Sequence, residues 1–243
     1  MARLKAGNFS GTVGKVILYT VKGENYMRTK PGKRKRKRGE PENPLLTIFG
    51  TVSKYGSAMI KGAAFYLRFS LGRDTYNRAR GWMRDQYAEH MNDAAWNLEL
   101  KHNAICHLNA GTDYRDLLRK DITVSDEGAG RVSIDIPAID PMRDLKTPPH
   151  NRRVNIKIMV ITSPFKVTGY PFHVVKEEYG FDQQNGIVPA KTISIDTATP
   201  NGIPTGHIAI VVIALEFDTT GNGQYNKEDR WLPAAVIAMG RLK

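Results

Sequence analysis

Seven short segments rich in strand-forming residues follow Asp113 and are separated by clusters of glycine, proline, asparagine and aspartate. Within them the spacing of apolar residues is close to two, the period of a β-strand. The segments are 121–125, 131–137, 154–162, 172–178, 192–196, 207–217 and 232–239. About seven such strands are typical of an immunoglobulin-like antiparallel β-sandwich, so residues 113–243 are predicted to form one. The uninterrupted apolar run 208–215 is expected to be its most buried strand.

In residues 43–112 the apolar residues recur at steps of three and four, which is the period of an amphipathic helix. Pro44 suits a helix start, and the apolar stripe that follows consists of Leu45, Ile48, Phe49, Val52, Tyr55, Met59, Ala63 and Leu67. After a break around 71–74, Asp74 is expected to cap a second helix that carries Tyr76, Met83, Tyr87 and Met91. A third short helix is expected over 93–107.

The first 42 residues are predicted to form a Gly-rich β-ribbon and a polybasic arm. Strand-forming residues lie between Phe9 and Arg28, and residues 22–25 are typical of a turn. A two-stranded ribbon is only marginally stable alone, so we expect this one to pack on the rest of the chain or on a neighbouring subunit. With the helical region and the sandwich, the ribbon makes the predicted fold class α+β.

The net charge of +12 is concentrated in the first sixth of the chain. Residues 1–38 contain 12 lysines and arginines against one glutamate, a net charge of +11, whereas the other 205 residues hold 24 basic and 23 acidic side chains. Six of the cations are consecutive, at 33–38, between Pro31-Gly32 and Gly39-Glu40-Pro41. Because such a run buries nothing and repels itself, residues 30–42 are predicted to be a flexible, solvated loop with a polyanionic partner.

The arm supplies the strongest functional prediction, because adjacent cations neutralise adjacent phosphates and release counterions without a fixed geometry. Nothing in the chain resembles a helix-turn-helix, a zinc finger or a paired aromatic platform, so binding to DNA or RNA is expected to be independent of base sequence. In a eukaryotic host the same run would also suit a nuclear import signal. The predicted nucleic-acid-binding residues are Arg28, Lys30, Lys33, Arg34, Lys35, Arg36, Lys37 and Arg38.

Aromatic and basic residues also interleave on the ribbon. The aromatic residues are Phe9, Tyr19 and Tyr26, and the cations between them are Lys15, Lys22 and Arg28. Two interpretations stay open: the rings are packing anchors, which is the more frequent role on a Gly-rich ribbon, or they stack on bases while the cations hold the backbone.

Two patterns resemble metal sites, and both are incomplete. Residues 218–229 place oxygen ligands and a glycine as a calcium loop does, but Thr220 replaces a carboxylate, Asp229 replaces a glutamate, and the flanks are predicted strands. His102 and Cys106 share a predicted helix face, yet two ligands make no zinc site. Because no hydrolase, Walker, zincin or dinucleotide motif is present either, the chain is expected to be non-catalytic, without metal or cofactor.

Cys106 is the only cysteine, which excludes an internal disulfide and agrees with a reducing compartment. Cys106 itself is expected to be a buried helix residue. No run of about 18 apolar residues occurs, and residues 1–14 lack the apolar stretch of a secretory signal. We therefore expect a cytoplasmic protein without a membrane span.

The motif Gly11-Thr12-Val13-Gly14-Lys15-Val16, followed by Tyr19, Lys22-Gly23, Tyr26-Met27-Arg28 and Pro31, resembles the start of an uncharacterised family of bacterial proteins found largely in the Bacteroidota. The likeness covers about residues 7–31. Proteins of that family are similar in length and also look like a Gly-rich ribbon, a helical stretch and a β-rich C-terminal half. They usually continue with a milder polar segment where this chain has six cations. The resemblance implies a prokaryotic origin and no particular activity.

These features predict a non-catalytic, nucleic-acid-associated accessory protein that binds the phosphate backbone through its arm and assembles, as a homo-oligomer or larger particle, through its folded parts. The alternative is a self-assembling structural protein, such as a phage virion or filament component, whose ribbon and arm contact neighbouring subunits. Two further alternatives are an enzyme with an unrecognised pocket and a protein attracted to anionic lipid, for which the arm lacks an adjacent apolar anchor.

Overall fold

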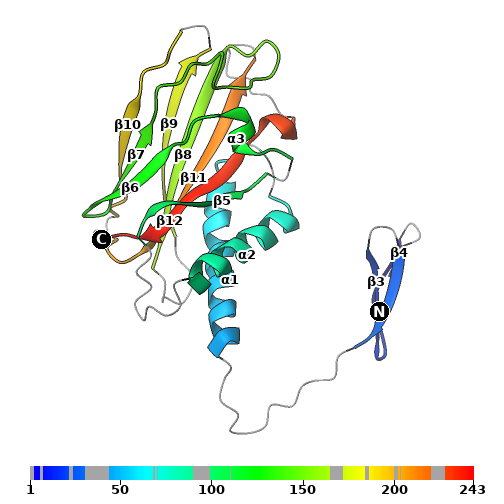
Figure 1. Ribbon diagram of the computed structural model, residues 1–243. Coiled ribbons are helices and arrows are strands. Elements are labelled where there is room, and N and C mark those ends of the chain that lie inside the picture. Colours follow the sequence, from blue (N-terminus) through cyan, green and yellow to red (C-terminus); the bar gives the residue numbers. More distant parts are fainter. Residues whose placement is uncertain are drawn as a thin grey trace. The chain divides into compact units, whose positions relative to one another are not determined.

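The computed structural model divides the chain into two units, residues 1–43 and 44–243. The structure describes residues 3–5, 8–21, 24–30, 44–67, 69, 71–89, 99–109, 111–164, 172–183, 186–199, 202, 204–219 and 228–243. The first unit consists of β-strands, and the second combines helices with two antiparallel sheets (Figure 1). The predicted α+β class is therefore confirmed. The predicted loop over 30–42 lies, apart from Lys30, outside the described residues.

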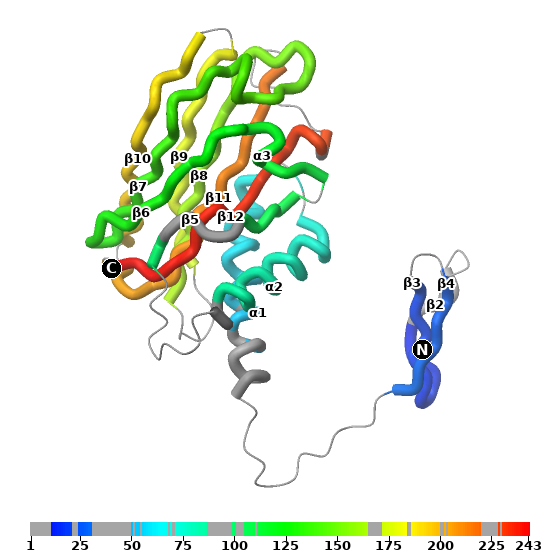
Figure 2. Tube along the Cα trace, in the orientation of Figure 1, coloured from blue at the N-terminus to red at the C-terminus, as the bar shows by residue number. Residues whose placement is uncertain are grey.

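The N-terminal unit is a four-stranded antiparallel sheet in the order β1-β2-β3-β4, of which Figure 2 labels β2, β3 and β4. Its strands are β1 (Arg3–Lys5), β2 (Asn8–Val13), β3 (Val16–Val21) and β4 (Glu24–Thr29). Gly14 takes a φ of +57° in the turn between β2 and β3, a region that glycine enters without steric cost. The expected two-stranded ribbon is thus wrong in its strand number, and Glu24 and Asn25, expected in a turn, pair with β3.

The C-terminal unit contains a sandwich of two antiparallel sheets (Figure 1). The larger sheet has the order β5 (Lys101–His107), β12 (Ala234–Arg241), β11 (Ile208–Asp218), β8 (Arg153–Ser163) and β9 (His173–Asp182). The smaller has the order β10 (Lys191–Asp196), β7 (Arg131–Ile136) and β6 (Thr123–Gly128). All seven predicted strands are present, so the antiparallel β-sandwich is confirmed, and its immunoglobulin-like character stays a prediction.

Successive side chains of the central strands project to opposite faces of the larger sheet and enter two separate hydrophobic cores. The odd-numbered residues of β11 from Ala209 to Phe217 enter the core between the sheets, together with the even-numbered residues of β8 from Val154 to Val160. The even-numbered residues of β11 from Ile208 to Ala214 enter a second core on the other face of the larger sheet. Every residue of β11 is buried, as expected of its uninterrupted apolar run.

Helices α1 (Pro44–Ala64) and α2 (Arg73–Glu89) cover that second face (Figure 1). Val52, Tyr55, Met59 and Ala63, members of the predicted apolar stripe of α1, are buried in the second core. The second helix begins one residue before Asp74, and the backbone N–H groups of Thr75 and Tyr76 donate to the carbonyl of Gly72. Gly72 is therefore the N-terminal cap. Asp74 lies in the first turn, where its negative charge interacts favourably with the positive end of the helix dipole.

The predicted third helix over 93–107 is wrong where the structure describes it, because residues 101–107 form β5 and pair with β12. Ile105 packs against the core between the sheets and its neighbour Cys106 against the core under the helices. Adjacent side chains on opposite faces require a strand. Three short elements are not predicted by the sequence: the strand β1, the helix α3 (Tyr114–Leu117), capped by Asp113, and the 3₁₀ turn η1 (Asp229–Trp231).

None of the helices in the described part of the chain is long and apolar enough to cross a membrane.

Candidate nucleic-acid interface

Two of the predicted nucleic-acid-binding residues, Arg28 and Lys30, lie at one end of the N-terminal sheet. Arg28 is opposite Ile17 in the register of β3 and β4, and the backbone N–H of Lys30 donates to the carbonyl of Lys15 over 2.5 Å. This bond extends the pairing one step beyond β4 and brings the Lys15 and Lys30 backbones together. The side chains of Lys15, Arg28 and Lys30 are exposed. The other six predicted residues, Lys33, Arg34, Lys35, Arg36, Lys37 and Arg38, lie outside the described residues.

Tyr19 and Tyr26 are directly opposite each other on β3 and β4. Their ring centroids are 5.7 Å apart and the ring planes meet at 21°, an offset-stacked arrangement. No paired aromatic platform is expected from the sequence, and the antiparallel register of β3 and β4 makes this pair from two tyrosines seven residues apart. Phe9 and Lys22, the other interleaved residues, have no described side chains.

Arg28 adds a cation to the tyrosine pair. Its guanidinium carbon lies 5.7 Å from the centroid of the Tyr19 ring, within the range of a cation–π contact. The Tyr26 hydroxyl donates to Glu24 Oε2 over 2.5 Å, and this bond raises the pKa of Tyr26 above its ordinary value. The face therefore presents two stacked rings, with the exposed cation Arg28 beside Tyr19 and the exposed carboxylate Glu24 beside Tyr26.

No group of three or more histidine, cysteine, aspartate and glutamate residues in the described ranges is placed to hold a metal ion. Most of the calcium-like pattern at 218–229 lies outside those ranges. Burial raises the pKa of Cys106 to about 11. A thiol with so high a pKa is almost entirely protonated at neutral pH and is a poor nucleophile.

A pocket of about 310 Å³ opens on the larger sheet beside the last turn of α1. Lys157 and Lys176 line it together with Tyr66, Met159 and Glu178. The Lys157 ammonium lies 2.7 Å from Glu216 Oε1 and 3.8 Å from Glu178 Oε1, and that of Lys176 lies 5.3 Å from the centroid of the Tyr66 ring. Both cations thus interact with groups of the protein, and two glutamates, Glu177 and Glu178, also line the pocket, so its lining has no excess of positive charge.

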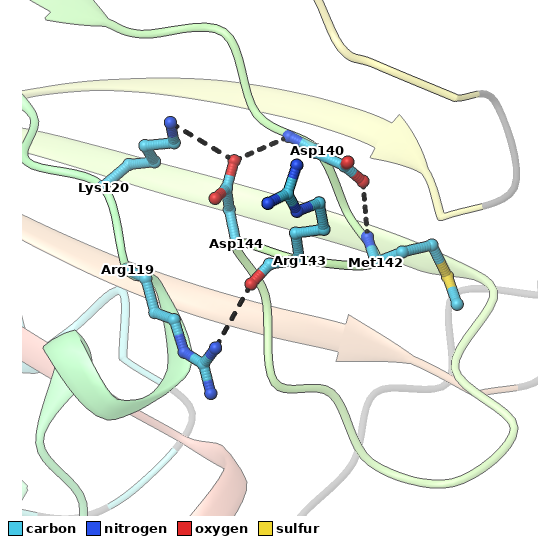
Figure 3. Close-up of polar contacts among 6 residues, drawn as sticks. All are labelled: Arg119, Lys120, Asp140, Met142, Arg143 and Asp144. Carbon is cyan, nitrogen blue, oxygen red and sulfur yellow. Dashed lines mark hydrogen bonds and ion pairs between the residues drawn. The ribbon is translucent and has the colours of Figure 1, made fainter.

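A second group of basic residues, Arg119, Lys120 and Arg143, surrounds the turn at 140–144 (Figure 3). Asp144 Oδ2 accepts from the backbone N–H of Asp140 at 2.9 Å and lies 3.5 Å from the Lys120 ammonium. The hydrogen bond from Asp140, followed by the charge of Lys120, holds the pKa of Asp144 below its usual value. Arg119 donates to the Arg143 carbonyl at 3.4 Å. These contacts close a surface turn, so we assign the group a structural role.

Comparison with protein-family models gives no match to this chain, and none of the curated proteins matches it.

Proposed function

We propose that the chain is a non-catalytic, nucleic-acid-associated accessory protein that binds the phosphate backbone without sequence specificity. The polybasic arm at 33–38 supplies most of the affinity, and Arg28 and Lys30 continue the cationic track onto the N-terminal sheet. The phosphate backbone is common to DNA and RNA, so both are candidate ligands.

The observation that carries the proposal is the separation of charge between the two units. Residues 1–43 hold 12 basic and three acidic side chains, a net charge of +9, whereas residues 44–243 hold 24 basic and 21 acidic side chains, a net charge of +3. A charge needed only for solubility is commonly spread over the surface, whereas a dense local cluster attracts a polyanion. In the larger unit the pocket cations Lys157 and Lys176, and the cations Arg119 and Lys120 beside the turn at 140–144, interact with carboxylates, a carbonyl or a ring.

The test is the salt dependence of binding to a labelled DNA duplex, measured by fluorescence anisotropy. If the arm neutralises about six phosphates, the logarithm of the binding constant falls with the logarithm of salt concentration with a slope of about −5, so affinity drops about a thousandfold between 50 and 200 mM salt. Replacing all six residues of 33–38 by glutamine is expected to reduce the slope to about −2, the contribution of the remaining Arg28 and Lys30, and to remove most of the binding, with the circular dichroism spectrum unchanged.

A matched control removes the same number of charges from the larger unit. Six exposed cations there are replaced by glutamine: Lys61, Arg73, Arg131, Arg143, Lys146 and Arg152. The control has the same net charge as the arm variant but keeps the arm. It is therefore expected to bind with a salt slope near that of the unmodified protein. Equal loss of affinity in the two variants would mean that net charge, and not the arm, determines binding.

The competing function is self-assembly, in which ribbon and arm contact neighbouring subunits. None of the described side chains of the N-terminal sheet is buried, as expected of an element that completes its packing on a partner. Size-exclusion chromatography after nuclease and high-salt treatment separates the two functions. A small species that has lost its 260 nm absorbance favours nucleic-acid binding, whereas a large particle free of nucleic acid favours self-assembly.

A further inference from the structure

One face of the N-terminal sheet carries aromatic rings that the sheet does not bury. Tyr19, Tyr26, Ile17 and Arg28 lie on this face, because residues directly opposite in an antiparallel register project to the same side. Tyr19 is 36% exposed and Tyr26 is 43% exposed. The N-terminal sheet itself covers neither ring, so they do not anchor the packing of that sheet. These two rings touch each other and leave a large part of their surface open.

The geometry of the pair suits a further flat ring. Offset-stacked rings with centroids 5.7 Å apart and planes at 21° form the beginning of a stack, and a nucleobase can extend such a stack with its own π-face. The hydrogen bond from the Tyr26 hydroxyl to Glu24 holds one ring in place before a ligand arrives. Less ordering of side chains is then needed on binding, which favours affinity.

The charge around the rings selects an anionic ligand. Arg28 lies beside Tyr19, and Lys15 and Lys30 lie at the end of β4 from which the arm continues. Exposed aromatic rings alternating with cations along an open surface are the arrangement by which proteins bind single-stranded nucleic acid: bases stack on the rings and phosphates meet the cations. A duplex keeps its bases inside the helix and cannot use the rings in this way.

We propose that Tyr19, Tyr26 and Arg28 form a stacking site for unpaired nucleobases, which makes the protein prefer single-stranded nucleic acid to duplex. This inference rests on the proposed function, because the arm supplies the sequence-independent affinity for phosphate to which the stacking site adds. Glu24, the one acidic residue among the first 38, keeps its negative charge while it accepts the hydrogen bond from Tyr26, and the cations Lys15, Arg28 and Lys30 outnumber it on this sheet.

The experiment compares three ligands with the full chain: a labelled single-stranded thymidine oligonucleotide, a duplex of equal length, and inorganic polyphosphate as a competitor that carries charge but no bases. The test variant is Tyr19→Leu with Tyr26→Leu, which keeps apolar residues on both strands and removes the rings. Its affinity for the single strand is expected to fall at least about tenfold, the effect of losing one to two stacked bases. Its affinity for duplex and for polyphosphate is expected to change less than twofold.

Two controls guard against a change in folding. Tyr19→Phe with Tyr26→Phe keeps both rings and is expected to bind the single strand as the unmodified protein does. Thr20→Ala with Asn25→Ala alters the cross-strand pair next to the tyrosines, on the opposite face of the same strands, and is also expected to keep single-strand binding.

The outcomes separate the two proposals. If the unmodified protein binds all three ligands but the leucine variant keeps its single-strand affinity, or loses duplex and polyphosphate binding to the same extent, the stacking site is wrong and the proposed function stands. If the unmodified protein binds none of the three ligands at 50 mM salt, the proposed function itself is wrong and the stacking site with it.

Discussion

At the scale of single residues, the most unusual feature of the larger unit is a buried ion pair beside an apolar core. The helix-covered face of β11 is apolar from Ile208 to Ala214 and then continues with Glu216, whose side chain is 3% exposed. Lys157 of β8 lies on the same face and is 14% exposed. Because a charge taken out of water is costly unless it is paired, each of the two side chains depends on the other.

The first prediction concerns this pair. Glu216→Leu leaves the Lys157 ammonium with Glu178 at 3.8 Å in place of its contact of 2.7 Å with Glu216. We expect the free energy of unfolding, measured in urea, to fall by about 3 kcal/mol, which is typical of removing one partner of a buried pair. The double variant Lys157→Met with Glu216→Leu is expected to recover most of this loss, because neither charge remains. A double variant as unstable as the single one would contradict the explanation by pairing.

At the scale of elements, the backbones of β12 and of the segment before β5 approach each other closely at Gly240. Gly240 lies on β12 opposite Ala209 of β11. A side-chain carbon added at Gly240 would overlap the backbone N and Cα of Leu100, just before β5. Gly81 in α2 offers the opposite case, since nothing lies within 4 Å of a carbon added there.

The second prediction compares alanine at these two glycines. Gly240→Ala is expected to lower the free energy of unfolding by about 2 to 3 kcal/mol, because backbone must move to make room for the new carbon. Gly81→Ala is expected to raise it by up to about 1 kcal/mol, since alanine favours a helix interior and meets no neighbour. Urea unfolding of both variants gives the values. A stable Gly240→Ala protein would show that residues 99–100 do not pack against β12 in solution.

The elements also show how far the sequence alone could predict the structure. The seven strands after Asp113 were predicted because their apolar residues have the period of a strand and are flanked by turn residues. β5 was missed because Lys101-His102-Asn103-Ala104 begins it with no apolar alternation, and only its pairing with β12 makes it a strand. The spacing of apolar residues predicts a strand where the segment itself alternates. It does not predict a strand such as β5, whose conformation depends on pairing with a distant segment.

In the candidate site, too, the sequence indicates some features, and others depend on the pairing of strands. Arg28 and Lys30 were identified from charge alone, without any knowledge of structure. Tyr19 and Tyr26 were noted as interleaved aromatics, but their stacking depends on the β3–β4 register. The contact of Lys157 with Glu216 joins residues 59 positions apart through the β8–β11 register. Sequence therefore indicates which residue types are available, and register decides which of them meet.

At the scale of the whole molecule, the two units differ in how each is stabilised. Among the described residues, the members of both cores of the larger unit lie between 52 and 242. The N-terminal sheet has no described side chain that is buried, although its described strands are fully paired with their neighbours. Stability and ligand affinity are therefore expected to depend on different parts of the chain.

The last prediction tests this division by deleting residues 1–43. The fragment 44–243 keeps both cores, so its thermal midpoint is expected to stay within about 2 °C of that of the full chain, less than the shift that 1 kcal/mol produces in a protein of this size. Its affinity for single-stranded and duplex DNA is expected to be lost, because a net charge of +3 spread over 200 residues releases few counterions. Differential scanning calorimetry and anisotropy titrations measure the two quantities separately. If the fragment still binds DNA, the interface lies on the larger unit, and the cations around the turn at 140–144 are the next residues to replace. If the fragment unfolds at a much lower temperature than the full chain, the N-terminal sheet completes the fold of the larger unit.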